Sequence, residues 1–177
     1  MSIWNNRNNP YIAGTVHTID RSALGAGIVQ TGGAPIKSGQ VVIIVGNSGE
    51  TPGNNGMSII RKATVAEIII GNQLAIANNA MGMAIDGEVT YTSPGTSGAF
   101  AVPLTLLNSN SVVSVAITGA FTAEVGAICI ADDGTFKVYD PVDDEGKLIL
   151  GVPVSNKRFP GDAVEVAKVR FHRPIQG

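Results

Sequence analysis

The chain has 177 residues, of which 44% are hydrophobic, 5% aromatic and 15% charged, and its formal net charge is -2. Its basic residues are scattered, whereas non-specific binding to nucleic acid needs positive charge concentrated against phosphates, so nucleic acid is not an expected partner. No apolar run approaches the roughly 20 residues of a membrane-spanning helix, and the N-terminal stretch lacks the apolar segment of a secretory signal. With a single cysteine, Cys129, and therefore no intrachain disulfide, the sequence predicts a soluble protein made in a reducing cytoplasm and not bound to membranes.

Residues 1–33 differ in kind from the rest of the chain. They are rich in Asn and Gly and show little regular hydrophobic pattern. We predict an extended N-terminal arm over residues 1–33 and a single β-rich domain over residues 34–177. Trp4, Arg7 and Tyr11 are the predicted contact residues of the arm, because Trp, Tyr and Arg dominate binding hot spots. The alternative is a frayed terminus.

Short β-branched apolar runs separated by Gly- and Asn-rich turns follow the predicted arm. The run from Gln40 to Val45 (QVVIIV) is continuous and bounded by glycines, which predicts a buried strand. Further strands are predicted over residues 57–70, 88–92 and 100–107. Residues 71–87 permit a short helix, although their Asn pair and glycines disfavour a long one.

The stretch from Val112 to Phe171 has the clearest pattern. Val113, Val115 and Ile117 alternate with smaller or polar residues, which is the period of a strand with one buried face. The alternation returns in residues 148–154, after turns that contain Gly, Asp and Pro. The sequence therefore predicts a mainly β fold, a compact β-meander or a small barrel-like core, with at most one or two short helices.

Two loops with the sequence Asn-Ser-Gly or Thr-Ser-Gly raise the question of a serine nucleophile. They lie at residues 47–49 and 96–98, and His17 and Asp20 precede them. A nucleophilic serine needs a base within hydrogen-bond reach and a group that orients the base. Neither His17 nor His172 lies in a recognisable motif, and 177 residues are expected to be too few for the two-barrel architecture that assembles such a triad. We expect no catalytic residues, so the chain is predicted not to be an enzyme.

Acidic residues gather in the turns of the C-terminal half, namely Asp132, Asp133, Asp140, Asp143, Asp144 and Glu145. Closely spaced loop carboxylates can bind Ca²⁺, but their spacing does not match an EF-hand loop. The Gly-rich loop over residues 46–56 lacks the Gly-Lys-Ser/Thr ending of a phosphate-binding loop. These turns are therefore predicted to be solvated, and we expect no metal and no cofactor.

A series of turn-and-strand motifs runs through residues 38–171. The motifs are S-G-Q-V-V-I-I-V-G (38–46), V-A-I-T-G-A-F-T-A (115–123), V-G-A (125–127), D-D-G-T-F (132–136), L-G-V-P-V (150–154) and P-G-D-A-V-E-V (160–166). This order resembles the capsid cement or head-decoration proteins of tailed phages. The resemblance implies a small, mostly β protein on the outside of an icosahedral head.

The resemblance further implies the partners and the place of action. Such a protein binds the major capsid protein, stabilises the shell and assembles as a homo-oligomer, often a trimer, so this chain is expected on the capsid exterior of a virion after synthesis in the host cytoplasm. The alternative is a β-rich virion surface module that recognises host glycans or receptors. The low aromatic content, 5%, is unfavourable to that alternative, because sugar-binding faces commonly stack their ligand on exposed rings.

Overall fold

The computed structural model describes residues 14, 16–18, 24–47, 57–64, 66–67, 74–77, 90–95, 101–107, 110–118, 126–131, 135–155 and 166–177. The strands of this part of the chain are β1 (Val16–Thr18), β2 (Leu24–Val29), β3 (Ile36–Lys37), β4 (Val41–Asn47), β5 (Ser58–Lys62), β6 (Leu74–Ala77), β7 (Thr90–Tyr91), β8 (Ala101–Leu106), β9 (Val112–Thr118), β10 (Ile128–Ile130), β11 (Phe136–Val138), β12 (Leu148–Pro153) and β13 (Val166–Gln176). The predicted mainly β fold is confirmed.

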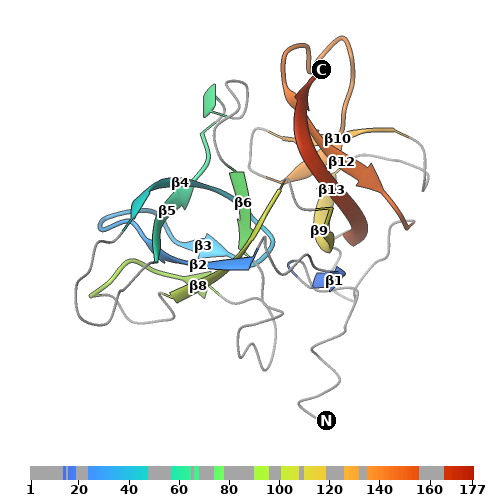
Figure 1. The fold of residues 1–177 in the computed structure, drawn as a ribbon. Helices are drawn as coiled ribbons and strands as arrows, with labels where there is room; N and C mark the ends of the chain where they lie inside the picture. The colour runs from blue at the N-terminus through green and yellow to red at the C-terminus, as the bar shows by residue number, and fades with distance from the viewer. Residues whose placement is uncertain are drawn as a thin grey trace.

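Five strands form a closed barrel in the order β2-β5-β4-β6-β8 (Figure 1). The pair β2–β5 is parallel, and the other pairs are antiparallel. Closure matters because a closed barrel leaves no strand edge to pair with another chain. A short two-stranded sheet, β3–β7, places Ile36 and Tyr91 in the apolar cluster of this barrel.

A second sheet has six strands in the order β1-β9-β11-β10-β12-β13, and an additional pairing joins β9 to β13. The strands β9, β11, β10, β12 and β13 therefore form a second ring. Because β9 and β11 are parallel, the arrangement is not an uninterrupted meander, and the barrel-like alternative of the prediction is the one observed. The second ring needs little chain, because strands such as β10 and β11 have only 3 residues each.

Strands β4 and β6 join the two rings, because both faces are buried at the start of β4 and along all of β6. Val41 and Ile43 of β4 belong to a core cluster with the six-stranded sheet, whereas Val42 between them packs inside the barrel. In β6, Leu74 and Ile76 face the sheet, and Ala75 and Ala77 face the barrel interior. Successive side chains of a strand point to opposite faces, so a strand covered on both sides reads as a continuous apolar run. The predicted strand in QVVIIV is confirmed, although only Val41, Val42 and Ile43 of the run are buried and Val45 is exposed. A strand replaces the predicted short helix at Leu74–Ala77.

Two strands lie within residues 1–33, which the sequence predicted as an extended arm. β1 pairs with β9, and β2 is hydrogen-bonded to neighbours on both sides in the barrel. The closed barrel therefore includes residues that precede the predicted boundary at residue 33. Glycines lower the strand propensity of β2, yet Gly27 suits this crowded position, because a Cβ there would lie 3.0 Å from Ile60 Cγ2 and 3.1 Å from Leu104 Cδ1.

Candidate functional site

The two histidines occupy separate places, and each is engaged locally. His17 Nε2 lies 2.7 Å from Ser114 Oγ, a contact that fastens β1 to β9. Burial, with the nearby positive charge of Lys168, lowers the pKa of His17. Ser114 is fully buried and is thus shielded from any substrate. His172 Nδ1 donates to the backbone carbonyl of Arg173 at 2.7 Å.

The other residues considered for catalysis and contact belong to two groups. Ser48, Ser97 and Asp20 lie outside the described residues, as do the predicted contact residues Trp4, Arg7 and Tyr11. The absence of catalysis stays a prediction. Among the described residues, no group of three or more His, Cys, Asp or Glu side chains is arranged to hold a metal ion. The same part of the chain contains no helix with the length and apolarity to cross a membrane.

A buried carboxylate anchors the loop between β11 and β12, residues 139–147. Asp144 is 1% exposed and accepts hydrogen bonds from Lys137 Nζ at 3.0 Å and from the backbone N–H of Asp140, also at 3.0 Å. Lys147 Nζ lies 2.9 Å from the same carboxylate. Burial opposes the ionisation of Asp144, but these hydrogen bonds outweigh it and hold its pKa below the usual range. The expectation of solvated acidic turns is therefore wrong for Asp144.

Cys129 lies under this anchored loop. Its Sγ is 3.7 Å from Asp144 Oδ2 and donates a weak hydrogen bond to it. Burial, followed by the negative charge of Asp144, raises the pKa of Cys129 to about 12. The thiolate is the reactive form of cysteine, so this buried thiol is held in its unreactive form. Cys129 is thus a free, buried thiol of the core.

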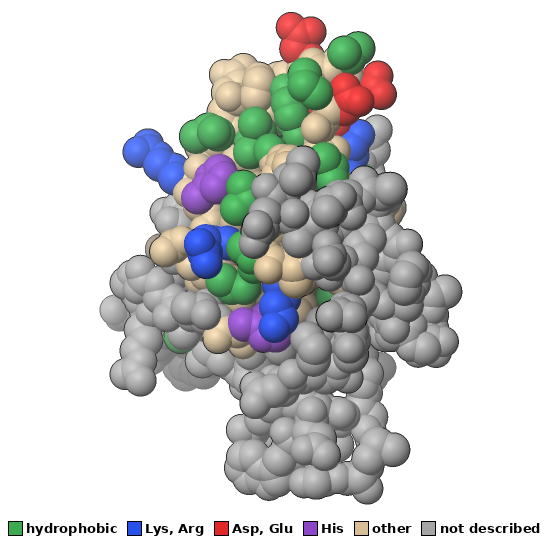
Figure 2. Space-filling model, turned by 90° about the vertical axis from the view of Figure 1, so that its right-hand side faces the viewer, with side chains coloured by type: hydrophobic (Ala, Val, Ile, Leu, Met, Phe, Trp, Pro, Cys, Tyr) green, Lys and Arg blue, Asp and Glu red, His purple; other side chains and the backbone are tan. Residues whose placement is uncertain are grey.

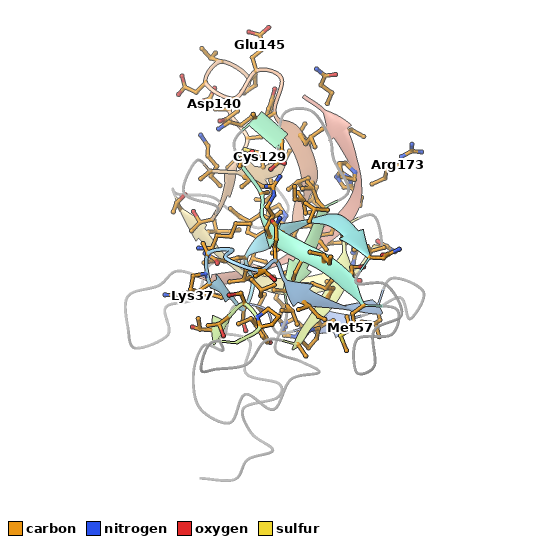
Figure 3. The ribbon with its side chains drawn as sticks, turned by 90° about the vertical axis from the view of Figure 1, so that its left-hand side faces the viewer. Lys37, Met57, Cys129, Asp140, Glu145 and Arg173 are labelled. Carbon is orange, nitrogen blue, oxygen red and sulfur yellow. The ribbon has the colours of Figure 1, made fainter. Side chains whose placement is uncertain are left out.

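The outer part of the anchored loop, which we call the acidic tip, consists of Asp140, Val142, Asp143 and Glu145. Its three acidic residues are exposed, and Val142 is 84% exposed, the largest value among the exposed large hydrophobic residues of the described chain. Asp140 Oδ1 accepts the backbone N–H of Val142 at 2.8 Å, which fixes the turn. Figure 3 shows Asp140 and Glu145 at the upper end of the molecule, above Cys129. The tip is a rigid projection with an apolar residue between carboxylates.

A second charged surface, which we call the basic strand face, consists of Lys168, Arg170 and Arg173 of β13 together with Val152 of β12. Val152 is 40% exposed and lies directly opposite Arg170 in the strand pair. Within the described part of the chain, no ion pair engages the three cations. Figure 2 shows Lys, Arg and His side chains along one face of the molecule and carboxylates at its upper end, with hydrophobic side chains between them.

An apolar groove of about 440 Å³ lies on the closed barrel, on the other half of the molecule. It is lined by Ile28, Val29, Gln30, Thr31, Val45, Ile59 and Pro94. Among the described residues of its lining there is no titratable side chain, and Val45 is the most exposed large hydrophobic residue, at 43%. The described part of the groove therefore offers mainly apolar contact.

The chain matches no protein-family model, no curated protein and no solved structure in comparisons with these three sets.

Proposed function

We propose that this chain is a structural protein that decorates and stabilises the exterior of a viral capsid as a homo-oligomer. The motif order in residues 38–171 supports this proposal through its resemblance to phage cement proteins. The motifs S-G-Q-V-V-I-I-V-G and L-G-V-P-V coincide with β4 and β12, one from each ring of strands. The resemblance therefore extends over both halves of the fold.

The observation that carries the proposal is that the strands directly after the predicted contact residues, β1 and β2, are each hydrogen-bonded into one of the two rings. β1 is paired with β9 and held by the contact between His17 and Ser114. β2 is hydrogen-bonded on both sides in the closed barrel. A contact made by Trp4, Arg7 and Tyr11 would thus be transmitted to both rings, which share the buried strands β4 and β6. A stiff body loses little conformational entropy on binding.

Such a body would stabilise a shell by mass action. A protein that binds the assembled shell and not its dissociated parts shifts the equilibrium towards the shell. In a homo-oligomer, each further footprint binds at the effective concentration set by the first, so weak single contacts add up to tight attachment. This function requires shape and rigidity rather than reactive groups.

The test compares binding to purified, undecorated shells of the cognate major capsid protein. The arm deletion must remove residues 2–13 only, because a deletion to residue 33 would remove β1 and β2. We expect the shortened chain to lose shell binding while its thermal unfolding is unchanged.

A triple variant, Trp4→Ala with Arg7→Ala and Tyr11→Ala, should reproduce the loss, and a matched control, Asn5→Ala with Asn8→Ala and Asn9→Ala, should bind normally. Unchanged binding of the triple variant would refute the contact assignment. Failure of the full chain to bind shells, with saturable binding to glycans on an array, would replace decoration by host recognition.

A further inference from the structure

We infer that the acidic tip of one copy of this chain docks on the basic strand face of a second copy. This inference deepens the homo-oligomer part of the proposed function by naming the two surfaces that meet. It is tested without capsid shells, so that it and the proposed function can fail separately.

The two surfaces have equal and opposite formal charge. The tip carries the carboxylates of Asp140, Asp143 and Glu145, and the basic strand face carries the cations of Lys168, Arg170 and Arg173. In the described part of the chain, the ion pairs are Arg61–Glu67, Lys137–Asp144 and Lys147–Asp144, and none of them includes these six groups. Complementary charge of this kind steers association and fixes its register.

The tip and most of the basic strand face are too far apart to neutralise each other within one molecule. The tip loop ends at Leu148, which pairs with Gln176, and Gln176 lies eight residues beyond Lys168 on β13. At about 3.3 Å per residue, the separation along the strand is roughly 26 Å for Lys168 and roughly 20 Å for Arg170, whereas Arg173 lies closer. The Debye length at physiological ionic strength is about 8 Å, so attraction over the two longer distances is largely screened.

The anchor under the tip prevents the loop from bending over to close this gap. Asp144 is held by two lysines and a backbone N–H, and the C-terminal Gly177 N–H donates to the carbonyl of Lys147 at 3.0 Å. The loop is therefore fixed at both its middle and its base. A second copy is free to bring its own basic strand face to the tip.

Each surface also has an exposed apolar residue for the centre of the contact. Val142 projects from the tip, and Val152 lies beside Arg170 on the basic strand face, with Ile175 further along β13 at 53% exposure. Apolar residues at the centre and charged residues at the rim are the usual arrangement of a protein interface. Figure 2 shows the carboxylates at the upper end of the molecule and the basic side chains below them, so one copy can offer its tip to a neighbour while its basic strand face receives another tip.

The experiment uses two charge-reversed forms of the full chain and sedimentation velocity in the absence of shells. The tip-reversed variant is Asp143→Lys with Glu145→Lys, and the face-reversed variant is Arg170→Glu with Arg173→Glu. Each variant alone places like charges against each other. We expect wild-type protein to associate, more weakly at high salt, and each variant alone to associate at least about 100-fold more weakly, as expected where reversed charges replace attraction with repulsion.

Mixing the two variants supplies the decisive readout. In the mixture, every tip finds a face of opposite charge, so association should return, which also shows that both variants are folded. Lys62→Glu, a reversal at an exposed position on the closed barrel, should leave wild-type association unchanged. A monomeric wild type, undiminished association of either variant, or a mixture that stays dissociated would each overturn the inference.

Discussion

Replacing Asp144 with Asn should destabilise the fold far more than any other substitution in the acidic loop. Asp144 is 1% exposed and bonded to two lysines, Lys137 and Lys147, whose side chains are 29% and 14% exposed. Breaking a buried ion pair by removing one partner costs about 3–5 kcal/mol. Because both lysines retain some access to water, we expect the low end, about 3 kcal/mol. In a chain of this size, that corresponds to a fall of roughly 6–12 °C in Tm.

The assay is thermal and denaturant unfolding followed by circular dichroism at one fixed protein concentration. The matched control is Asp143→Asn, which removes a neighbouring exposed carboxylate and should change stability by less than about 0.5 kcal/mol. Because the folded-state pKa of Asp144 is lowered, its stabilisation is present above the unfolded-state pKa of about 3.9 and is lost as pH falls below it. The difference between wild type and Asp144→Asn should therefore be full at pH 7 and shrink in acid. Equal effects of the two substitutions at pH 7 would refute the anchoring role.

Three further predictions concern the described core and its surface. Cys129, with its pKa raised to about 12, should resist a thiol reagent at pH 8 in the native protein and react fully in denaturant; rapid native reaction would contradict its burial. Gly151→Ala should lower the free energy of unfolding in denaturant by about 1–3 kcal/mol. The reason is that a Cβ at Gly151 would collide with the backbone carbonyl of Arg170 across the β12–β13 pair. Unchanged stability would show that the two strands can shift apart. Glu67→Gln should lower the free energy of unfolding by only about 0.5–1 kcal/mol at pH 7, because the Arg61–Glu67 pair is partly exposed. The hydrogen bond from Arg61 lowers the pKa of Glu67 to about 2, so well below that pH the substitution should cost nothing measurable. A larger loss by thermal unfolding would mean that the pair organises more of the fold.

Local pattern was sufficient where burial alone determines a strand. The run QVVIIV predicted β4, because a strand covered on both faces has no polar side to interrupt it. The alternation of Val113, Val115 and Ile117 predicted β9, since each of these residues faces the core of the second ring. In both strands, the residues that face a covering surface are apolar, so the burial can be read directly from the sequence of the strand.

Strands that are stabilised by residues distant in the sequence were not predictable from the local pattern. β2 contains glycines that weaken strand propensity, and the limited space at Gly27 is set by Ile60 and Leu104 on the two neighbouring strands. β6 has only four residues, and its Leu-Ala-Ile-Ala pattern suits a helix as well as a strand. It forms a strand because it pairs with β4 and β8.

The same limit applies to the candidate surfaces. The acidic cluster was visible in the sequence, but the burial of Asp144 depends on two lysines. Lys137 on β11 precedes the loop, and Lys147 is at the end of the loop. The one local signal was Lys147, three residues after Asp144. Likewise, the exposed setting of Arg170 and Val152 follows from the register of β12 with β13, which no periodicity within either strand specifies.

Imaging of cognate shells with and without the full chain tests the proposed decoration most directly. The account predicts added density on the outer surface, repeated at symmetry-related positions, with each unit large enough for more than one copy of the two-ring body. Shells incubated with excess protein should also dissociate at a higher temperature than bare shells. Shells that show no added density at saturating protein concentration would contradict the account.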